Sequence, residues 1–94
     1  MHDAGLIRMH LDKIRQISVK AATTEDDFSI EIDQAIADAI SHISIVKTSD
    51  PTENLQAFAG QLNVFDQIET PSFPRQQEAM KYASASFKKQ IESR

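Results

Sequence analysis

The sequence of 94 residues contains no cysteine and no tryptophan, and it has only 2 glycines and 3 prolines. The absence of cysteine excludes disulfides, thiol catalysis and thiolate zinc sites. No apolar run approaches the roughly 18 residues that a membrane-spanning helix needs, and charges interrupt the stretch from Met1 to Lys20 where a signal peptide would be apolar. We therefore expect a cytoplasmic protein that makes no membrane contact.

Recognisable catalytic and nucleotide-binding motifs are also missing. No serine lies in a nucleophile elbow, and no glycine-rich phosphate loop exists because Gly5 and Gly60 stand alone. No Glu-x-x-His motif repeats along the chain, as a di-iron bundle would require. We expect no enzymatic activity, no cofactor and no metal site. The net charge of -4 and the lack of a helix-turn-helix signature argue against nucleic-acid binding.

Apolar residues recur with helical periodicity in four segments, which predicts helices at about residues 4 to 22, 25 to 47, 51 to 69 and 74 to 93. A strand interpretation competes over residues 28 to 33, where apolar and polar residues alternate. The helical pattern continues to Val46, so its length favours a helix. Four amphipathic helices with short connections predict a single all-α domain over residues 1–94, a small antiparallel up-and-down four-helix bundle.

The break before the third segment contains the clearest helix start. Asp50 occupies the N-cap position, Pro51 the first helical position, and Glu53 completes a D-x-x-E pattern. A carboxylate at the N-cap accepts hydrogen bonds from first-turn amides that have no partner inside the helix. We therefore expect the third helix to begin at Pro51.

The two middle segments each carry a second line of apolar residues, opposite the line that faces the predicted core. Single exposed apolar residues are normal on a soluble protein, but two aligned lines favour an interaction surface. A homodimer is the simplest partner hypothesis, because association also compensates for a small core. The candidate apolar interaction residues are Ile30, Ala37, Ile45, Ala57, Val64 and Ile68.

Charge is segregated along the chain. Residues 25–50 contain seven acidic residues and one basic residue, whereas the first and last segments are net basic. Such charges are usually a solvated helix face, but they also orient helix pairing or attract a protein partner with a basic surface. An acidic stripe of Asp27, Glu31 and Asp38 lies along one edge of the second helix, with His42 four residues after Asp38. We predict a polar contact site there.

The remaining histidines give weaker signals. His10 lies within the apolar arc of the first helix, which favours a hydrogen-bonded interior or interface histidine over a catalytic base. Burial would lower its pKa and make it sensitive to pH. The pair of Asp38 and His42 is compatible with metal binding, but an i, i+4 pair of this kind is common without a metal.

These features predict a small helical protein that acts as an adaptor, regulator or inhibitor by occupying a surface on another protein. An alternative from a different class is an immunity or antidote protein, or a phage-encoded inhibitor, since compact helical bundles of this size often serve that purpose. A third class, a metal- or phosphate-handling enzyme, rests only on His10, Asp38 and His42. The sequence does not identify the partner.

Overall fold

A computed structural model describes residues 2–94 and contains four helices within that range and no strand. They are α1 (Ala4–Ala21), α2 (Ser29–Ile45), α3 (Pro51–Asp66) and α4 (Pro74–Glu92). The predicted all-α four-helix bundle is confirmed, and residues 28 to 33 form no β-ladder. None of the helices in the described range is both long and apolar enough to cross a bilayer.

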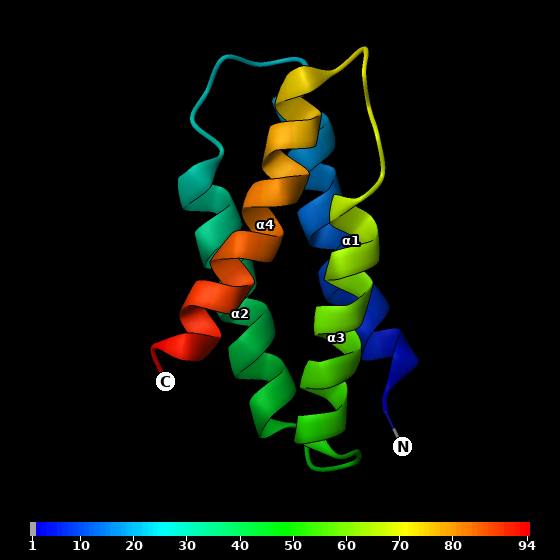
Figure 1. The fold of residues 1–94 in the computed structure, drawn as a ribbon. Coiled ribbons are helices and arrows are strands. Elements are labelled where there is room, and N and C mark those ends of the chain that lie inside the picture. The colour runs from blue at the N-terminus through cyan, green and yellow to red at the C-terminus, as the bar shows by residue number, and fades with distance from the viewer. Residues whose placement is uncertain (1) are drawn as a thin grey trace.

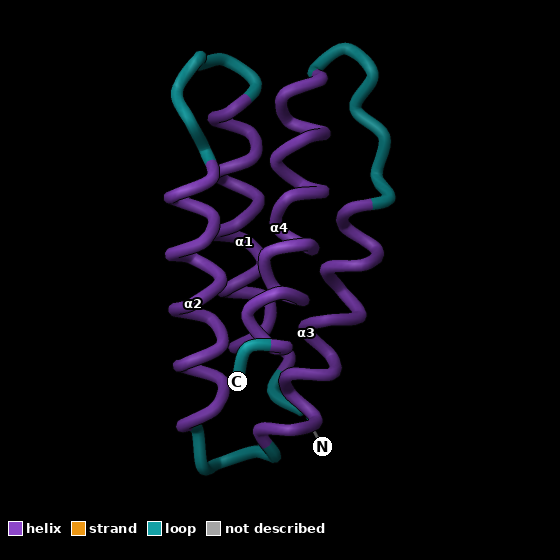
Figure 2. Tube along the Cα trace, turned by 60° about the vertical axis from the view of Figure 1, so that its left-hand side comes forward, coloured by secondary structure: helices purple, strands orange, loops and turns teal. Residues whose placement is uncertain are grey.

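Helix direction alternates along the chain, as Figure 1 shows. Neighbouring helices enclose four lengthwise grooves, between α1 and α2, α2 and α4, α4 and α3, and α3 and α1. The order around the bundle is therefore α1, α2, α4, α3, with α2 opposite α3 (Figures 1 and 2). Two neighbouring pairs, α2 with α4 and α1 with α3, run parallel. Helices α1 and α4 pack closely across the centre, and α4 contacts all three other helices.

Two of the helix starts follow from short-range chemistry. The carboxylate of Asp50 accepts a hydrogen bond from the backbone N–H of Thr52 at 2.9 Å, and Pro51 is the first residue of α3, as the sequence predicts. Helix α2 begins later than expected, at Ser29, because the carboxylate of Asp27 accepts hydrogen bonds from the Ser29 N–H at 2.9 Å and the Ser29 hydroxyl at 2.7 Å. This contact ends the preceding loop and fixes the first turn of α2.

The core contains the periodic apolar residues of all four helices, in agreement with the spacing that predicts each helix. The buried apolar residues are Leu6, Ile7, Ile14, Ala21, Ile32, Ile36, Ala39, Ile40, Ile43, Phe58, Leu62, Phe65, Ala79, Met80, Ala83 and Phe87. The rings of Phe58 in α3 and Phe87 in α4 meet edge to face, with centroids 5.4 Å apart.

Arg75 of α4 holds the loop between α1 and α2. Its Nε donates to the carbonyl of Ala21 at 3.1 Å, its Nη2 donates to the carbonyl of Asp26, and its guanidinium lies over the ring of Phe28. At the other end of the bundle, Asn54 is fully buried. Its side chain accepts from the Asp3 N–H at 2.7 Å and donates to the Ser49 hydroxyl at 2.8 Å. The Arg75 contacts fasten the α1–α2 loop at one end of the bundle, and the Asn54 contacts fasten the chain at the other end.

Candidate functional site

The two predicted apolar lines lie on opposite sides of the bundle. Ile30 and Ala37 line the groove between α2 and α4, whereas Val64 and Ile68 line the groove between α1 and α3. These grooves are opposite because α2 and α3 are diagonal in the bundle (Figure 1). One flat interface with a second chain therefore covers one line and leaves the other in solvent.

The apolar residues of both lines are strongly exposed, apart from the two alanines. Ile30 is 75% exposed, Ile45 71%, Val64 68% and Ile68 51%. Ala37 and Ala57 are half-buried against their neighbouring helices. Covering exposed aliphatic side chains with a partner stabilises the complex, by about 25 cal/mol for each Å² of apolar surface removed from water.

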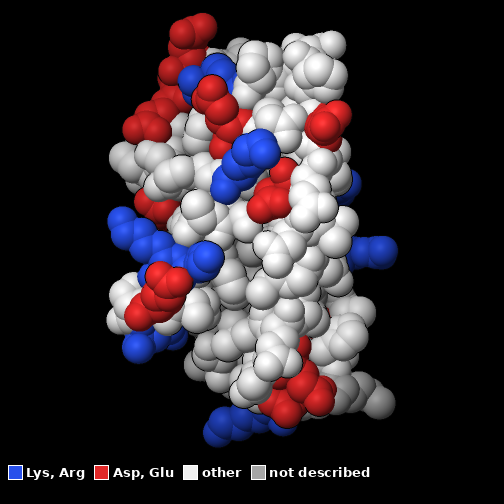
Figure 3. Space-filling view, viewed as in Figure 1, with Lys and Arg blue, Asp and Glu red and all other residues white. Residues whose placement is uncertain are grey.

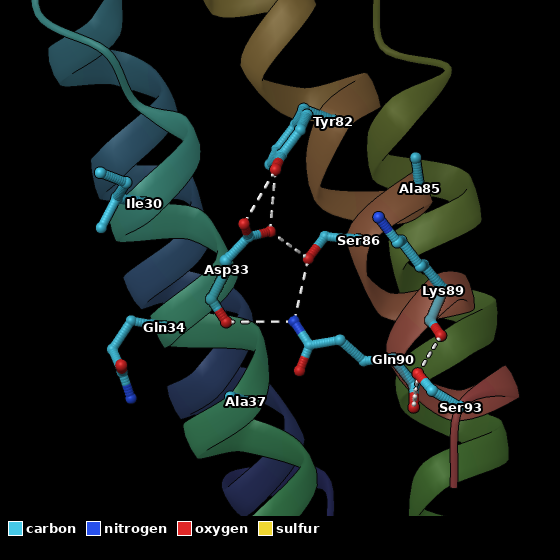
Figure 4. Close-up of a pocket in the computed structure, with 10 residues that line it drawn as sticks. All are labelled: Ile30, Asp33, Gln34, Ala37, Tyr82, Ala85, Ser86, Lys89, Gln90 and Ser93. Carbon is cyan, nitrogen blue, oxygen red and sulfur yellow. Dashed lines mark hydrogen bonds between the residues drawn. The ribbon is translucent and has the colours of Figure 1, made fainter.

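A groove of about 580 Å³ separates α2 from α4, and polar side chains bridge its floor (Figure 4). The hydroxyl of Tyr82 donates to the carboxylate of Asp33, lying 2.9 Å from each of its oxygens, and the Ser86 hydroxyl donates to the same carboxylate at 2.7 Å. The amide of Gln90 donates to the backbone carbonyl of Asp33 at 3.1 Å and to the Ser86 hydroxyl at 3.0 Å. Asp33 thus links α2 to three side chains of α4.

This network gives the groove an acidic, hydrogen-bonded centre with apolar side chains along its walls. Burial raises the pKa of the Tyr82 phenol, and the adjacent Asp33 carboxylate raises it further. Ser86 is itself buried, so its hydroxyl depends on the Asp33 carboxylate and Gln90 for partners. Ala85 and Lys89 form the α4 wall opposite Ile30.

The groove between α1 and α3 has a different chemistry. Leu11 and Phe65 form its base, and Val64 and Ile68 form one wall. Its charged wall residues already pair with each other within α1, since the Arg15 guanidinium lies 2.8 Å from the Asp12 carboxylate. Covering this side would therefore remove Val64 and Ile68 from water without leaving either of these two charges unpaired.

Two members of the acidic stripe, Glu31 and Asp38, line the groove between α1 and α2, which basic residues of α1 also line. The Lys20 ammonium lies 3.2 Å from the Glu31 carboxylate, and Lys13 lines the same groove. Asp38 accepts from the Gln34 amide of its own helix at 2.9 Å. Asp27 bonds Ser29, and these hydrogen bonds lower the pKa of its carboxylate. Each member of the stripe therefore has a contact within the chain.

Charged side chains are spread unevenly over the face shown in Figure 3. In Figure 3 acidic side chains gather at the upper left, above the start of α2, and an area with few charged side chains covers much of α3. The exposed residues Val64 and Ile68 belong to α3 and the connection that follows it.

His42 bonds a residue of another helix. Its Nδ1 lies 2.9 Å from Nε2 of His10 in α1, and the two rings meet edge to face with centroids 5.0 Å apart. His10 is buried, as its apolar-face position predicts, whereas His42 is exposed. Across residues 2–94, no three histidine or carboxylate side chains gather closely enough to hold a metal ion.

Sequence reasoning identifies the exposed apolar residues but misses the polar centre of the α2–α4 groove. Asp33, Tyr82, Ser86 and Gln90 carry no motif, and Asp33 is separated from its α4 partners by 49 to 57 residues. The spacing of Tyr82, Ser86 and Gln90 at intervals of four is the one available signal, because it places three polar side chains on one edge of α4.

Comparison with protein-family models, with curated proteins and with solved structures finds no match to this chain.

Proposed function

We propose that this chain is a small helical interaction protein that acts by occupying a surface on another protein, and that it first associates with a second copy of itself. The observation that carries the proposal is the pair of exposed aliphatic lines on opposite sides of the bundle. Val64 is 68% exposed beside α1, and Ile30 is 75% exposed beside α4. A monomer leaves both in contact with water.

The α1–α3 side is the better candidate for self-association. Val64 and Ile68 line it from one side, and the charges of Asp12 and Arg15 compensate each other. Covering this side therefore removes apolar surface from water without isolating a charge, which would be costly. A two-fold axis next to Val64 and Ile68 would place each residue against the other copy.

The α2–α4 side suits a different protein partner. Covering its groove brings the Asp33 carboxylate under the partner, and a buried carboxylate needs more donors than Tyr82 and Ser86 provide. A partner that presents a lysine or arginine between apolar side chains meets this need. A partner with a basic surface is therefore proposed for this side.

Sedimentation equilibrium over a wide concentration range tests the self-association. Wild-type protein is expected to dimerise, and Val64→Lys is expected to be monomeric with an unchanged helical circular dichroism spectrum. Asn63→Lys, at the exposed neighbouring position of α3, is the matched control that introduces the same charge without removing an apolar contact. Ile30→Lys is expected to leave the dimer intact.

Two results would contradict the proposal. A wild-type chain that remains monomeric at high concentration rules out the homodimer. If Ile30→Lys abolishes association and Val64→Lys does not, the copies meet through the α2–α4 side and the assignment of sides is wrong.

A further inference from the structure

The contact between His10 and His42 is a side-chain hydrogen bond that joins α1 to the last turn of α2. The distance between His10 Nε2 and His42 Nδ1 is 2.9 Å. His10 is only 3% exposed, whereas His42 faces solvent. Together with the Asp3–Asn54 bond, this contact holds the first half of α1 against the bundle through polar groups.

The hydrogen bond requires one of the two facing nitrogens to accept. A neutral imidazole has one donor nitrogen and one acceptor nitrogen, and a protonated imidazole has two donors. The bond therefore forms when both rings are neutral, and also when only His42 is protonated and His10 accepts. It cannot form when both rings are protonated, because two N–H groups then face each other.

His10 has no other way to accommodate a proton in this position. Its second nitrogen, Nδ1, is buried and has no hydrogen-bond partner within the described residues. In a protonated ring this nitrogen carries an N–H that is both charged and unpaired, which is costly away from water.

The ionisable groups around His10 come from α1 and α2. Burial lowers the pKa of His10 most, the nearby His42 and Lys13 lower it further, and Asp38 opposes them. Within residues 2–94, no ionisable group of α3 or α4 contributes to this shift. The positive groups His42 and Lys13 therefore reinforce the effect of burial, and the carboxylate of Asp38 compensates only in part.

We propose that the His10–His42 pair is a proton-sensitive latch, which holds α1 against α2 near neutral pH and releases this end of the bundle when both rings are protonated. Release moves the His10 ring into solvent, where its charge is hydrated. The first half of α1 then loses the polar attachment that His10 provides. The device goes beyond the proposed interaction function, because it regulates the bundle itself.

Ring NMR signals followed from about pH 8 to about pH 5 test the latch directly. The His10 ring is expected to stay neutral as the pH falls past 6.5, the usual pKa of an imidazole. As His10 then takes up its proton, amide signals should change at the His10–His42 end and not at the Arg75 end. A His10 ring that titrates at or above the usual imidazole value of 6.5 overturns the proposal.

Urea unfolding at one fixed protein concentration provides the second readout. For each unit by which the fold lowers the pKa of His10, the unfolding equilibrium constant rises up to about tenfold on acidification, equivalent to about 1.4 kcal/mol. His10→Leu places an apolar side chain at this buried position and should remove that part of the acid sensitivity. An unchanged pH dependence in His10→Leu contradicts the latch.

Two further variants keep the test decisive if His10→Leu does not fold. His42→Gln retains the buried His10 but removes the second charge, so the pKa of His10 is lowered less and the amide changes should move to higher pH. Lys13→Gln is a matched control that removes a neighbouring charge but preserves the pair, and its latch should still open. If the amide changes in His42→Gln occur at the wild-type pH, the pair is not the latch.

Discussion

The hydroxyl of Tyr82 and the carboxylate of Asp33 face each other across the α2–α4 groove, with the phenol oxygen 2.9 Å from both carboxylate oxygens. Tyr82 also packs its ring edge to face against Phe28, with centroids 6.0 Å apart. The same residue thus joins α4 to α2 through its polar end and to the start of α2 through its ring.

Tyr82→Phe is expected to lower the free energy of unfolding by about 1 kcal/mol, because it removes the hydrogen bond and retains the ring. The same substitution in an Asp33→Asn background should cost less, since the charged acceptor is already absent. Chemical denaturation of the four members of this double-mutant cycle measures the difference. Ser44→Ala is the control, because the Ser44 hydroxyl bonds only a backbone carbonyl of its own helix. Equal costs in both backgrounds would show that Tyr82 and Asp33 are not coupled.

The phenol of Tyr82 should titrate above its usual value of 10.0, because burial and Asp33 both favour the neutral form. Tyr82 is the only tyrosine and the chain has no tryptophan, so phenolate absorbance reports this residue alone. Because the folded pKa is raised, the stability that this phenol contributes is complete below about pH 10 and is lost as the pH rises through the folded value. Asp33→Asn should return the midpoint towards 10; an unshifted wild-type midpoint would argue against the contact.

The acidic stripe should contribute unequally to stability. Glu31→Gln is expected to change the free energy of unfolding by less than about 1 kcal/mol, because both it and Lys20 are about half exposed to solvent. Asp27→Ala should lower the melting temperature more, since Asp27 holds the first turn of α2. The pKa of Asp27 is lowered, so its contribution is present above about pH 4 and is lost as the pH falls further. Thermal unfolding at neutral and acid pH distinguishes the two variants, and equal effects would remove Asp27 from this role.

Gly60→Ala should stabilise the chain by roughly 0.5 to 1 kcal/mol, because glycine is unfavourable in a helix interior. A Cβ at this position meets no atom within 4 Å, so the added methyl group has room. Denaturation midpoints measure the gain. If the same substitution instead weakens self-association and leaves the stability of the monomer unchanged, this exposed part of α3 belongs to the proposed dimer interface.

Periodicity predicts the four helices because each must bury one apolar face, and it also places Ile30, Ile45, Val64 and Ile68 outside the core. The start of α2 differs by several residues, because the side chain of Asp27 competes with the backbone for the first-turn amide. Boundaries of this kind depend on one hydrogen bond, whereas the helix depends on many contacts.

The neighbours of each helix were not predictable in the same way. Periodicity shows which face of α2 is exposed but not which helix lies beside it, and short loops favour placing α2 next to α3. In the bundle the connection from α2 to α3 instead crosses the end, which puts Ile30 and Val64 on opposite sides. The Asp33–Ser86 and His10–His42 contacts follow from this arrangement, so no local pattern predicts them.

The crossed connection also affects how the chain reaches its native state. Helices α1 and α2 can meet early because they are close in sequence, but α2 meets α4 only through residues about 50 positions apart, such as Asp33 and Tyr82. Contacts so distant in sequence close late and slow the folding of a helical protein. Because α4 contacts all three other helices, a chain that ends after α3 would expose the apolar residues that α4 covers. On the ribosome, the nascent chain therefore remains prone to aggregation until α4 has emerged.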